Sequence, residues 1–261
     1  MKRTIIQPDL KVIPAEFHSL LADTTVYDSS CSPTARVLFI ERDKGYYLKS
    51  SPPGTLENEA AMTRYFHQKG LAAELMTYIT GEQDWLLTTR VQGENCTDPL
   101  YLSDPKRLCD ILATQLRSLH ELNAEGCPIP DHTAHYLKTA VDNYHNGHYD
   151  ASLFPDNWGY TSADEAFHVV EKYAHRLKTD TLLHGDYCLP NIMLDNWNFS
   201  GFIDLGNGGI GDRHVDLFWG IWTLCFNLKT DRYRERFLDA YGRDAVEEEM
   251  LRVIAACEVF G

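Results

Sequence analysis

The stretch from Thr181 to Asp204 constrains this chain more than any other part of the sequence. Three short apolar runs alternate with polar segments, which predicts three strands joined by a loop and a turn. The runs are Thr181–Leu183, Ile192–Leu194 and Phe199–Ile203. Asp186 and Asn191 fall in the loop, and Asp204 directly follows the third run. Side chains in such positions are held by a rigid scaffold, so they can be aimed at one point.

The spacing of these three side chains suits phosphoryl transfer from a nucleotide. That reaction needs a base near the attacking hydroxyl group and oxygen ligands for Mg2+. Protein kinases place the base Asp and a metal-binding Asn five residues apart in one loop, and a second metal-binding Asp follows on a turn. Asp186 and Asn191 are also five residues apart, and Asp204 follows within Ile-Asp-Leu-Gly. We therefore predict Asp186 as the catalytic base and Asn191 and Asp204 as the ligands of Mg2+.

The motif His-Gly-Asp-x-x-x-x-Asn at 184–191, followed by Ile-Asp-Leu-Gly, resembles the small-molecule kinases that share the protein-kinase fold. The segment Gly201–Asp216 adds a Gly-rich loop, an Asp-Arg pair and a further Asp, and it resembles the aminoglycoside 3'-phosphotransferases. The resemblance implies an α+β, two-lobed protein-kinase-like fold. It places a small antiparallel β-rich N-terminal nucleotide-binding lobe at residues 1–91 and a larger, mainly helical C-terminal catalytic and substrate-binding lobe at 92–261.

The same resemblance implies the chemistry. ATP, with GTP as an alternative donor, and Mg2+ are the expected cofactors. The expected acceptor is a polycationic aminoglycoside of the kanamycin or neomycin type, so the consequence would be antibiotic resistance. Two residues are assigned to structural support: His184, and Asp216, which would brace the catalytic loop.

In the N-terminal part, a β-hairpin is predicted to carry a phosphate-binding lysine. Its strands are Val37–Ile40 and Tyr46–Lys49. Lys49 would hold the nucleotide phosphates as a point charge. Thr55 is expected to cap a helix that continues through about Phe66. Glu59, in the early turns of that helix, would pair with Lys49; Glu57 is the competing acid, and the family pattern favours Glu59.

Three further nucleotide contacts are implied by the resemblance. Ser32 lies in the connection 29–35, which lacks the glycines of the protein-kinase loop but offers hydroxyl and backbone N–H groups to phosphate oxygens. An ordinary Ser/Thr turn is the alternative for this segment. Backbone groups near Thr89 and Val91, where a predicted strand runs into a linker, would bond the adenine edge.

Acceptor-binding residues are implied in the C-terminal part. They are Asp156, Asn157, Asp212, Arg213 and Glu258. For Asp212, Arg213 and Asp216, a salt-bridge network without substrate contact is the alternative. The sequence departs from the family pattern at Gly159 and Cys257, where the family has acids, so two carboxylates for substrate ammonium groups are missing.

Helices are predicted to make up most of this part. Asp104 with Pro105 is a helix start, and the apolar spacing predicts an amphipathic helix up to His120. Further helices are predicted at Val215–Leu228, Asp231–Tyr241 and Asp244–Phe260, the last one capped by Asp244. The run Gly206–Gly211 satisfies Gly-x-Gly-x-x-Gly, but helices rather than a second parallel strand follow it. We therefore interpret it as a flexible loop and not as a dinucleotide-binding fingerprint.

Composition narrows the partners. Lys and Arg total 24 against 38 Asp and Glu, and a net charge of −14 repels nucleic acid and anionic membranes and attracts a polycation. Acidity for solubility alone is the alternative. Seven cysteines without a Cys-x-x-Cys pair favour a reducing cytoplasm. The N-terminal apolar run is interrupted, and no apolar stretch is long enough for a membrane span. No obligate protein partner is inferred.

Three other functions stay open. A kinase of the same fold could act on another small hydroxyl or amine metabolite, which the missing acids favour. A second alternative is a nucleotide-binding module without catalysis, but the intact set of Asp186, Asn191 and Asp204 argues against it. A zinc site would use two His-x-x-His pairs, but solvated surface histidines are the favoured reading. The pairs are His132 with His135 and His145 with His148.

Overall fold

The computed structural model describes residues 3–31, 34–150 and 159–261, which form two compact units. The N-terminal unit comprises Met1–Asn95 together with Ile192–Gly206. The C-terminal unit comprises Cys96–Asn191 together with Asn207–Gly261. The division of the sequence at residue 91 did not anticipate that the segment 192–206 belongs with the N-terminal unit. Both units are described separately below.

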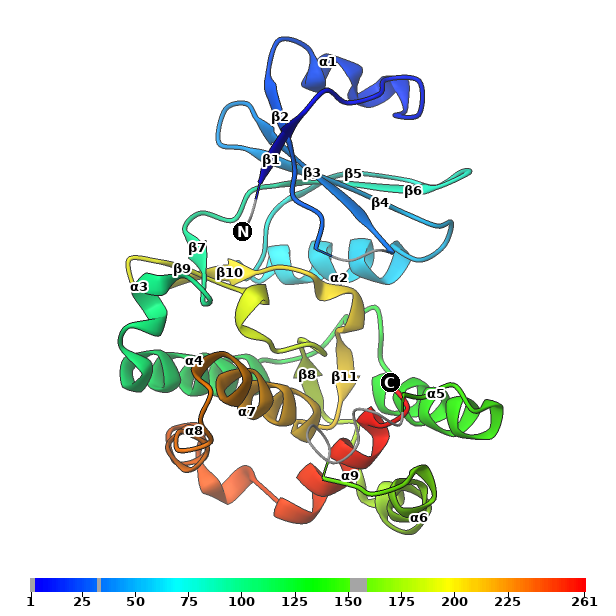
Figure 1. Ribbon diagram of the computed structural model, residues 1–261, viewed down its shortest axis with the longest axis vertical. Helices are drawn as coiled ribbons and strands as arrows, with labels where there is room; N and C mark the ends of the chain where they lie inside the picture. Colours follow the sequence, from blue (N-terminus) through cyan, green and yellow to red (C-terminus); the bar gives the residue numbers. More distant parts are fainter. Residues whose placement is uncertain (1–2, 32–33, 151–158) are drawn as a thin grey trace. The chain divides into compact units, whose positions relative to one another are not determined.

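A six-stranded antiparallel sheet of order β1-β2-β3-β4-β6-β5 forms the N-terminal unit (Figure 1). Its strands are β1 (Thr4–Ile6), β2 (Thr25–Asp28), β3 (Arg36–Glu41), β4 (Tyr46–Ser51), β5 (Leu75–Ile79) and β6 (Asp84–Thr89). The predicted hairpin is confirmed, because β3 pairs with β4 and places Val37 opposite Lys49. Side chains alternate along a strand, so Leu48 joins Leu38 and Trp85 in a core on one face while Lys49 points to the other face.

Each face of this sheet is covered by a helix of its own. Helix α1 (His18–Leu21) and the turn before it add Phe17 and Leu21 to the core around Leu38. Helix α2 (Glu57–Gln68) lies on the other face, where its Ala60 packs near Leu86. The predicted cap of α2 is wrong, because Leu56 is the N-cap residue and makes no side-chain capping bond. The Thr55 hydroxyl bonds instead to Ser51 and to the carbonyl of Pro52.

A second, three-stranded sheet of order β10-β9-β7 completes the N-terminal unit. Its strands are β7 (Glu94–Asn95), β9 (Ile192–Asp195) and β10 (Asn198–Phe202). The predicted second and third runs are therefore strands of one hairpin. The amide of Phe202 donates to the carbonyl of Leu71 at 2.7 Å, and the Phe202 ring lies edge-on to Phe66 of α2. These contacts attach the segment that ends at Asp204 to α2.

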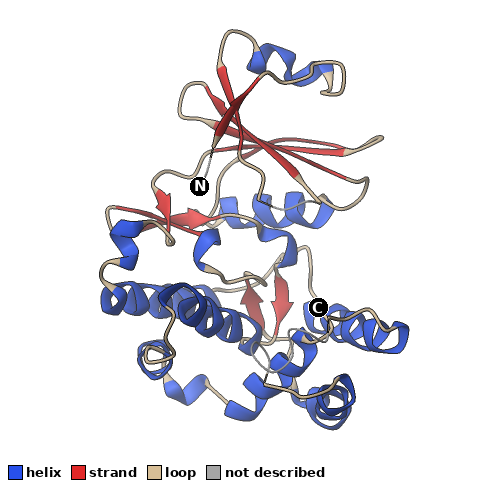
Figure 2. Cartoon of the chain, in the orientation of Figure 1, coloured by secondary structure: helices blue, strands red, loops and turns tan. Residues whose placement is uncertain are grey.

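The C-terminal unit is mainly helical (Figure 2). Its helices are α3 (Pro99–Leu102), α4 (Pro105–His120), α5 (His132–Asn146), α6 (Ala163–Tyr173), α7 (His214–Leu228), α8 (Arg234–Tyr241) and α9 (Glu248–Glu258). The predicted start of α4 is confirmed, because the Asp104 carboxylate accepts from the amide of Arg107. The predicted cap at Asp244 is wrong. A short 3-10 turn at Arg243–Ala245 intervenes, and α9 begins only after Glu247.

A two-stranded ribbon carries the loop that contains Asp186 and Asn191. Strand β8 (Thr181–Leu183) pairs antiparallel with β11 (Gly209–Gly211). The glycine run 206–211 was predicted to be a flexible loop, but its first two residues end a 3-10 turn (Leu205–Asn207) and its last three form β11. A Cβ atom on Gly209 would lie 2.9 Å from Ile129, and one on Gly211 would lie 2.7 Å from Leu183, so only glycine fits this close approach.

Within residues 3–31, 34–150 and 159–261, every helix is too short or too polar to span a membrane.

Candidate active site

The loop after β8 brings two predicted site residues into direct contact. The side-chain amide nitrogen of Asn191 donates to the Asp186 carboxylate at 2.8 Å and to its carbonyl at 3.1 Å. Asn191 ends a 3-10 turn (Leu189–Asn191), which explains how residues five apart in sequence meet. Because the nitrogen of the amide is used in this way, its oxygen is left as the group that a cation can bind.

Asp216 of α7 fixes the backbone of the same loop. Its two carboxylate oxygens accept from the amides of His184 and Gly185, each at 2.8 Å. Gly185 adopts a φ of +84°, and a Cβ there would lie 1.7 Å from the carbonyl oxygen of Asn207. The loop is thus held from α7 and closely covered by the segment around Asn207. His184 is itself fully buried, and its ring nitrogen Nδ1 accepts from the amide of Asp186 at 3.3 Å.

A buried network supports Asp216. The ring of His120 on α4 bridges Asp216, at 3.2 Å, and the Tyr241 hydroxyl, at 2.8 Å. Burial by itself raises the pKa of the Asp216 carboxyl, but the His120 ring and the loop amides outweigh it and hold the pKa below the usual range. For the His120 imidazole, burial lowers the pKa, because it disfavours the charged form of the ring. Asp216 is therefore a charged residue inside the unit, with its oxygens directed at the loop.

Three predicted nucleotide-site residues meet within the N-terminal unit. The Lys49 ammonium contacts the Glu59 carboxylate and the Asp204 carboxylate, both at 2.7 Å. Glu57, the competing acid, is not in this contact. Burial lowers the pKa of Lys49, but the charges of Glu59 and Asp204 outweigh it and raise the pKa above its usual value, so the ammonium stays charged.

Asp204 holds an oxygen available beside Lys49. Its backbone has a φ of +61°, and its side chain is about half exposed. One carboxylate oxygen contacts Lys49, and the other makes no hydrogen bond within the described part of the chain. The carboxylate oxygen of Asp204 in the N-terminal unit is a hard donor of the kind that Mg2+ prefers, and so is the amide oxygen of Asn191 in the C-terminal unit, so the chemistry of each residue fits this ion.

The other predicted nucleotide contacts are less defined. Ser32 lies outside the described residues. The amide of Thr89 donates to the carbonyl of Glu74, so this amide is already engaged within the N-terminal unit. Val91 is buried, and its side chain contacts the position of Gly201 in β10.

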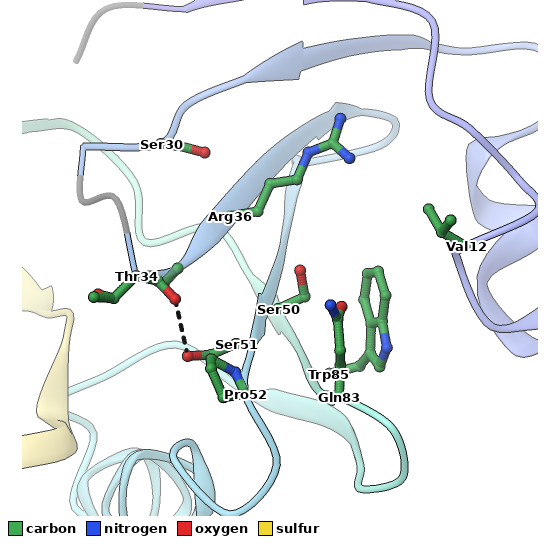
Figure 3. Close-up of a pocket in the computed structure, with 10 residues that line it drawn as sticks. Val12, Ser30, Thr34, Arg36, Ser50, Ser51, Pro52, Gln83 and Trp85 are labelled. Carbon is green, nitrogen blue, oxygen red and sulfur yellow. Dashed lines mark hydrogen bonds between the residues drawn. The ribbon is translucent and has the colours of Figure 1, made fainter.

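A hollow of about 580 Å3 in the N-terminal unit is not this site. Its lining includes Ser50, Trp85 and Arg36 (Figure 3). Ser50 follows Lys49 on β4, so their side chains point to opposite faces of the sheet. The part of the hollow that Ser50 and Trp85 line therefore lies on the face away from Lys49 and Glu59.

Two predicted acceptor contacts are engaged within the C-terminal unit instead. Asp212 is only 2% exposed, and its carboxylate binds the His214 ring at 2.6 Å and the amide of Lys178 at 2.7 Å. The Arg213 guanidinium donates to the Thr181 hydroxyl at 3.3 Å. This geometry favours the structural alternative for both residues. Asp156 and Asn157 lie outside the described residues.

Glu258, at the end of α9, is held by two residues that the sequence did not suggest. Its Oε1 atom accepts from the Tyr136 hydroxyl at 2.7 Å and from the Trp219 ring nitrogen at 3.2 Å. Burial raises the pKa of Glu258 to about 7, and the negative charge of Asp186 adds to the rise. Neither Tyr136 nor Trp219 belongs to a recognisable motif, because their role depends on contacts between distant helices.

The two altered family positions have different surroundings. Cys257 is 1% exposed and packs in the core between α5, α6 and α9. Gly159 has a φ of +74°, and no described atom lies within 4 Å of a Cβ placed there. Neither position supplies a carboxylate.

The histidine pairs do not form a metal site in the part of the chain described. No three His, Cys, Asp or Glu side chains gather there in a way that could hold an ion. His132 stacks on Tyr136 instead, and His145 lies against Phe167.

Comparisons with known proteins agree with this geometry. The model of the "Phosphotransferase enzyme family" matches residues 27–253. A probable aminoglycoside 3'-phosphotransferase of Lactococcus lactis is 51% identical over 256 residues, which cover 97% of each chain. The crystal structure of an aminoglycoside 3'-phosphotransferase of type VIII matches with a TM-score of 0.73 and 22% identity, over 99% of this chain and 94% of that one.

A second solved structure adds ligands to the comparison. It is an aminoglycoside phosphotransferase of Streptomyces rimosus in complex with ADP and streptomycin. Its TM-score is 0.72 at 23% identity, over 86% of this chain and 90% of that one. These likenesses confirm the predicted α+β, protein-kinase-like fold.

Proposed function

This chain belongs to the phosphotransferase enzyme family, and from that premise we propose that it transfers the γ-phosphoryl group of ATP to the 3'-hydroxyl group of an aminoglycoside. The observation that carries the proposal is the hydrogen-bonded pair of Asp186 and Asn191 on the loop held by Asp216. Phosphoryl transfer depends mainly on positioning and charge, and a loop fixed in this way supplies both.

Asp186 is proposed as the base. Asn191 donates to one carboxylate oxygen and thereby fixes the orientation of the group. The Asp186 carboxylate still has free lone pairs, which can accept the proton of the acceptor hydroxyl as the new P–O bond forms. The leaving group is ADP, so the balanced reaction converts ATP and an alcohol into ADP, a phosphate monoester and a proton.

Lys49 and the Mg2+ ligands are proposed to receive the nucleotide. Lys49, kept charged by Glu59, would bind phosphate oxygens. Asp204 and Asn191 would each offer an oxygen to Mg2+, which neutralises phosphate charge when bound. Ser32, Thr89 and Val91 remain proposed contacts of the nucleotide, and GTP remains an alternative donor.

The acceptor is proposed to be polycationic. Support comes from the net charge of −14, from Glu258 and from the 51% identical relative. Asp156, Asn157, Asp212 and Arg213 stay in the proposal as acceptor contacts from the resemblance, although the bonds of Asp212 and Arg213 favour a structural role. Phosphorylation of such an antibiotic would give resistance. All seven cysteines, which lie in the described part, are free thiols, and this supports a cytoplasmic location.

The test is ADP formation with Mg2+ and a panel of acceptors. We expect turnover with kanamycin and neomycin, and none with tobramycin, which lacks the 3'-hydroxyl group. A second candidate is a kinase for another small alcohol or amine, and it is kept because Cys257 and Gly159 supply no carboxylate. Turnover with such a metabolite, and with none of the antibiotics, would establish that candidate instead.

A further inference from the structure

Asp84 is a fully buried carboxylate at the start of β6, remote in sequence from every motif considered so far. It is 0% exposed, and its Oδ2 atom accepts from the amide of Leu56 at 2.9 Å and from the Tyr78 hydroxyl at 3.0 Å. Burial alone raises the pKa of Asp84, but hydrogen bonding to its carboxylate, led by the Leu56 amide, outweighs this and brings the pKa below the usual range. The Oδ1 atom is buried and has no hydrogen-bond partner among the described residues. Asp84 is thus a buried charge whose Oδ2 atom accepts two hydrogen bonds.

The strand directs Asp84 toward α2. The next residue, Trp85, lines the hollow on the opposite face together with Gln83 (Figure 3). Side chains alternate along β6, so Asp84 points away from the hollow, like Leu86, which packs against Leu56. This is also the face on which Lys49 lies, because Lys49 is directly opposite Leu86 in the β4–β6 register.

Helix α2 begins without a cap of its own. Leu56 is the N-cap residue and has no side chain that can accept from the first amides. The first turn of a helix presents unpaired amides and a partial positive charge. The Asp84 carboxylate, 28 residues further along the chain, accepts from the amide of Leu56 itself and brings a negative charge to the start of the helix.

Asp84 therefore joins the two elements that form the Lys49–Glu59 pair. It lies opposite Ser51 in the β4–β6 register, two residues after Lys49 on β4. Its carboxylate holds the residue before α2, and Glu59 lies in the first turn of that helix. A displacement of the helix start by about 1 Å would break a charge-assisted contact of 2.7 Å between Lys49 and Glu59.

We infer that Asp84 is a positioning residue, which sets the start of α2 so that Glu59 meets Lys49 and the ammonium is aimed at the nucleotide. The inference rests on the proposed role of Lys49 in nucleotide binding. It assigns Asp84 no contact with substrate, only an action through Glu59.

The test measures the dissociation constant of ATP, and the KM values for both substrates, in Asp84→Asn. We expect the dissociation constant of ATP to rise about fivefold or more, because the helix loses a charged cap, while the KM for the acceptor stays unchanged. Tyr78→Phe removes one donor from the same carboxylate and should raise the dissociation constant of ATP by a smaller factor. It replaces Asp84→Asn as the test if that variant folds poorly. Asp104→Asn, which alters the cap of α4, is the matched control and should leave ATP binding unchanged.

A double-mutant cycle separates positioning from general damage. In a Glu59→Gln background, Asp84→Asn should change ATP binding by less than about twofold, because the partner through which it acts is gone. The inference would be overturned if Asp84→Asn weakened ATP binding equally in the wild-type and Glu59→Gln backgrounds. It would also be overturned if Asp84→Asn and Tyr78→Phe bound ATP normally while Glu59→Gln bound ATP more weakly. Normal ATP binding in Glu59→Gln itself would overturn both the inference and the proposed binding of the nucleotide phosphates by Lys49 and Glu59.

Discussion

The side-chain amide of Asn191 donates to the carboxylate of Asp186 at 2.8 Å. The proposed Mg2+ ligand and the proposed base are therefore in direct contact. The contact orients the proposed base with the nitrogen of the amide. It leaves the amide oxygen for Mg2+. The orientation of the base and the proposed binding of the ion are therefore coupled through one side chain.

Replacement of Asp186 by Asn should remove the base and spare the nucleotide. We expect kcat to fall by about 10² to 10⁴, which is the range for a lost general base. The dissociation constant of ATP should stay within about twofold of the wild-type value. Asp195→Asn, at the exposed last residue of β9, is the control for the loss of one negative charge. Full turnover in Asp186→Asn would remove the assignment of the base.

Lys49→Met tests the phosphate contact. Loss of the ammonium removes its proposed hydrogen bonds to phosphate and leaves Glu59 and Asp204 as unpaired acids. ATP should bind about 10- to 100-fold more weakly, since hydrogen bonds to charged groups are worth about 1.5–3 kcal/mol. Lys44→Met, in the exposed β3–β4 turn, is the matched control. Equal affinities in the two variants would show that Lys49 does not bind the nucleotide.

Gly185→Ala tests the tight backbone of the catalytic loop. A methyl group there would lie 1.7 Å from the carbonyl oxygen of Asn207. Gly126→Ala is a close control, because Gly126 has a similar positive φ of +76° and no atom within 4 Å of a Cβ. We expect Gly126→Ala to lose about 1–2 kcal/mol from backbone strain alone. Gly185→Ala should lose clearly more in urea denaturation and should lose activity as well.

Asp216→Asn tests the buried brace and its pH dependence. Loss of a buried charge that His120 and two amides stabilise should reduce the free energy of unfolding by about 3–5 kcal/mol at pH 7. The folded-state pKa of Asp216 is depressed, so its contribution is fully present above the unfolded value of about 3.9. It is lost as the pH falls through the folded value. The gap between wild type and variant should thus be constant from pH 6 to 8 and shrink below pH 4, and a gap that grows in acid would contradict this.

Glu258 should make acceptor binding depend on pH near neutrality. Its pKa of about 7 in the free chain means that the carboxyl is largely protonated at pH 6 and ionised at pH 8. A cationic acceptor needs the ionised form, so its KM should fall as the pH rises through 7. The same profile in Glu258→Gln isolates this group from the amines of the antibiotic itself. If the two profiles coincide, Glu258 does not meet the acceptor.

Much of the site was predictable because its residues are close in sequence. Asp186 and Asn191 share one loop, and Lys49 and Glu59 are separated by a single turn between β4 and α2. Residues this close in sequence are positioned by the same loop, or by one strand and the helix that follows it, so their contact can be predicted from local structure. The hairpin of β3 and β4 and the start of α4 at Asp104 were predicted for the same reason.

The remaining contacts could not be read from the sequence, because tertiary packing creates them. The sequence shows an Asp-Arg pair at 212 and 213 but not that Asp212 is buried against His214 and Lys178. Thr55 has the side chain of a helix cap, yet the start of α2 is held by the Asp84 carboxylate of β6, which accepts from the amide of Leu56. The glycines at 209–211 allow a flexible loop as well as a strand, and only the nearby side chains of Ile129 and Leu183 decide for the strand.

The most direct test of the proposed reaction is phosphorus–proton correlation NMR of the product formed from ATP, Mg2+ and kanamycin. The account predicts one new phosphate monoester whose phosphorus couples to the proton at carbon 3', with ADP formed in equal amount. Coupling to any other carbon, or the absence of a new phosphate monoester while ATP still binds, would contradict it.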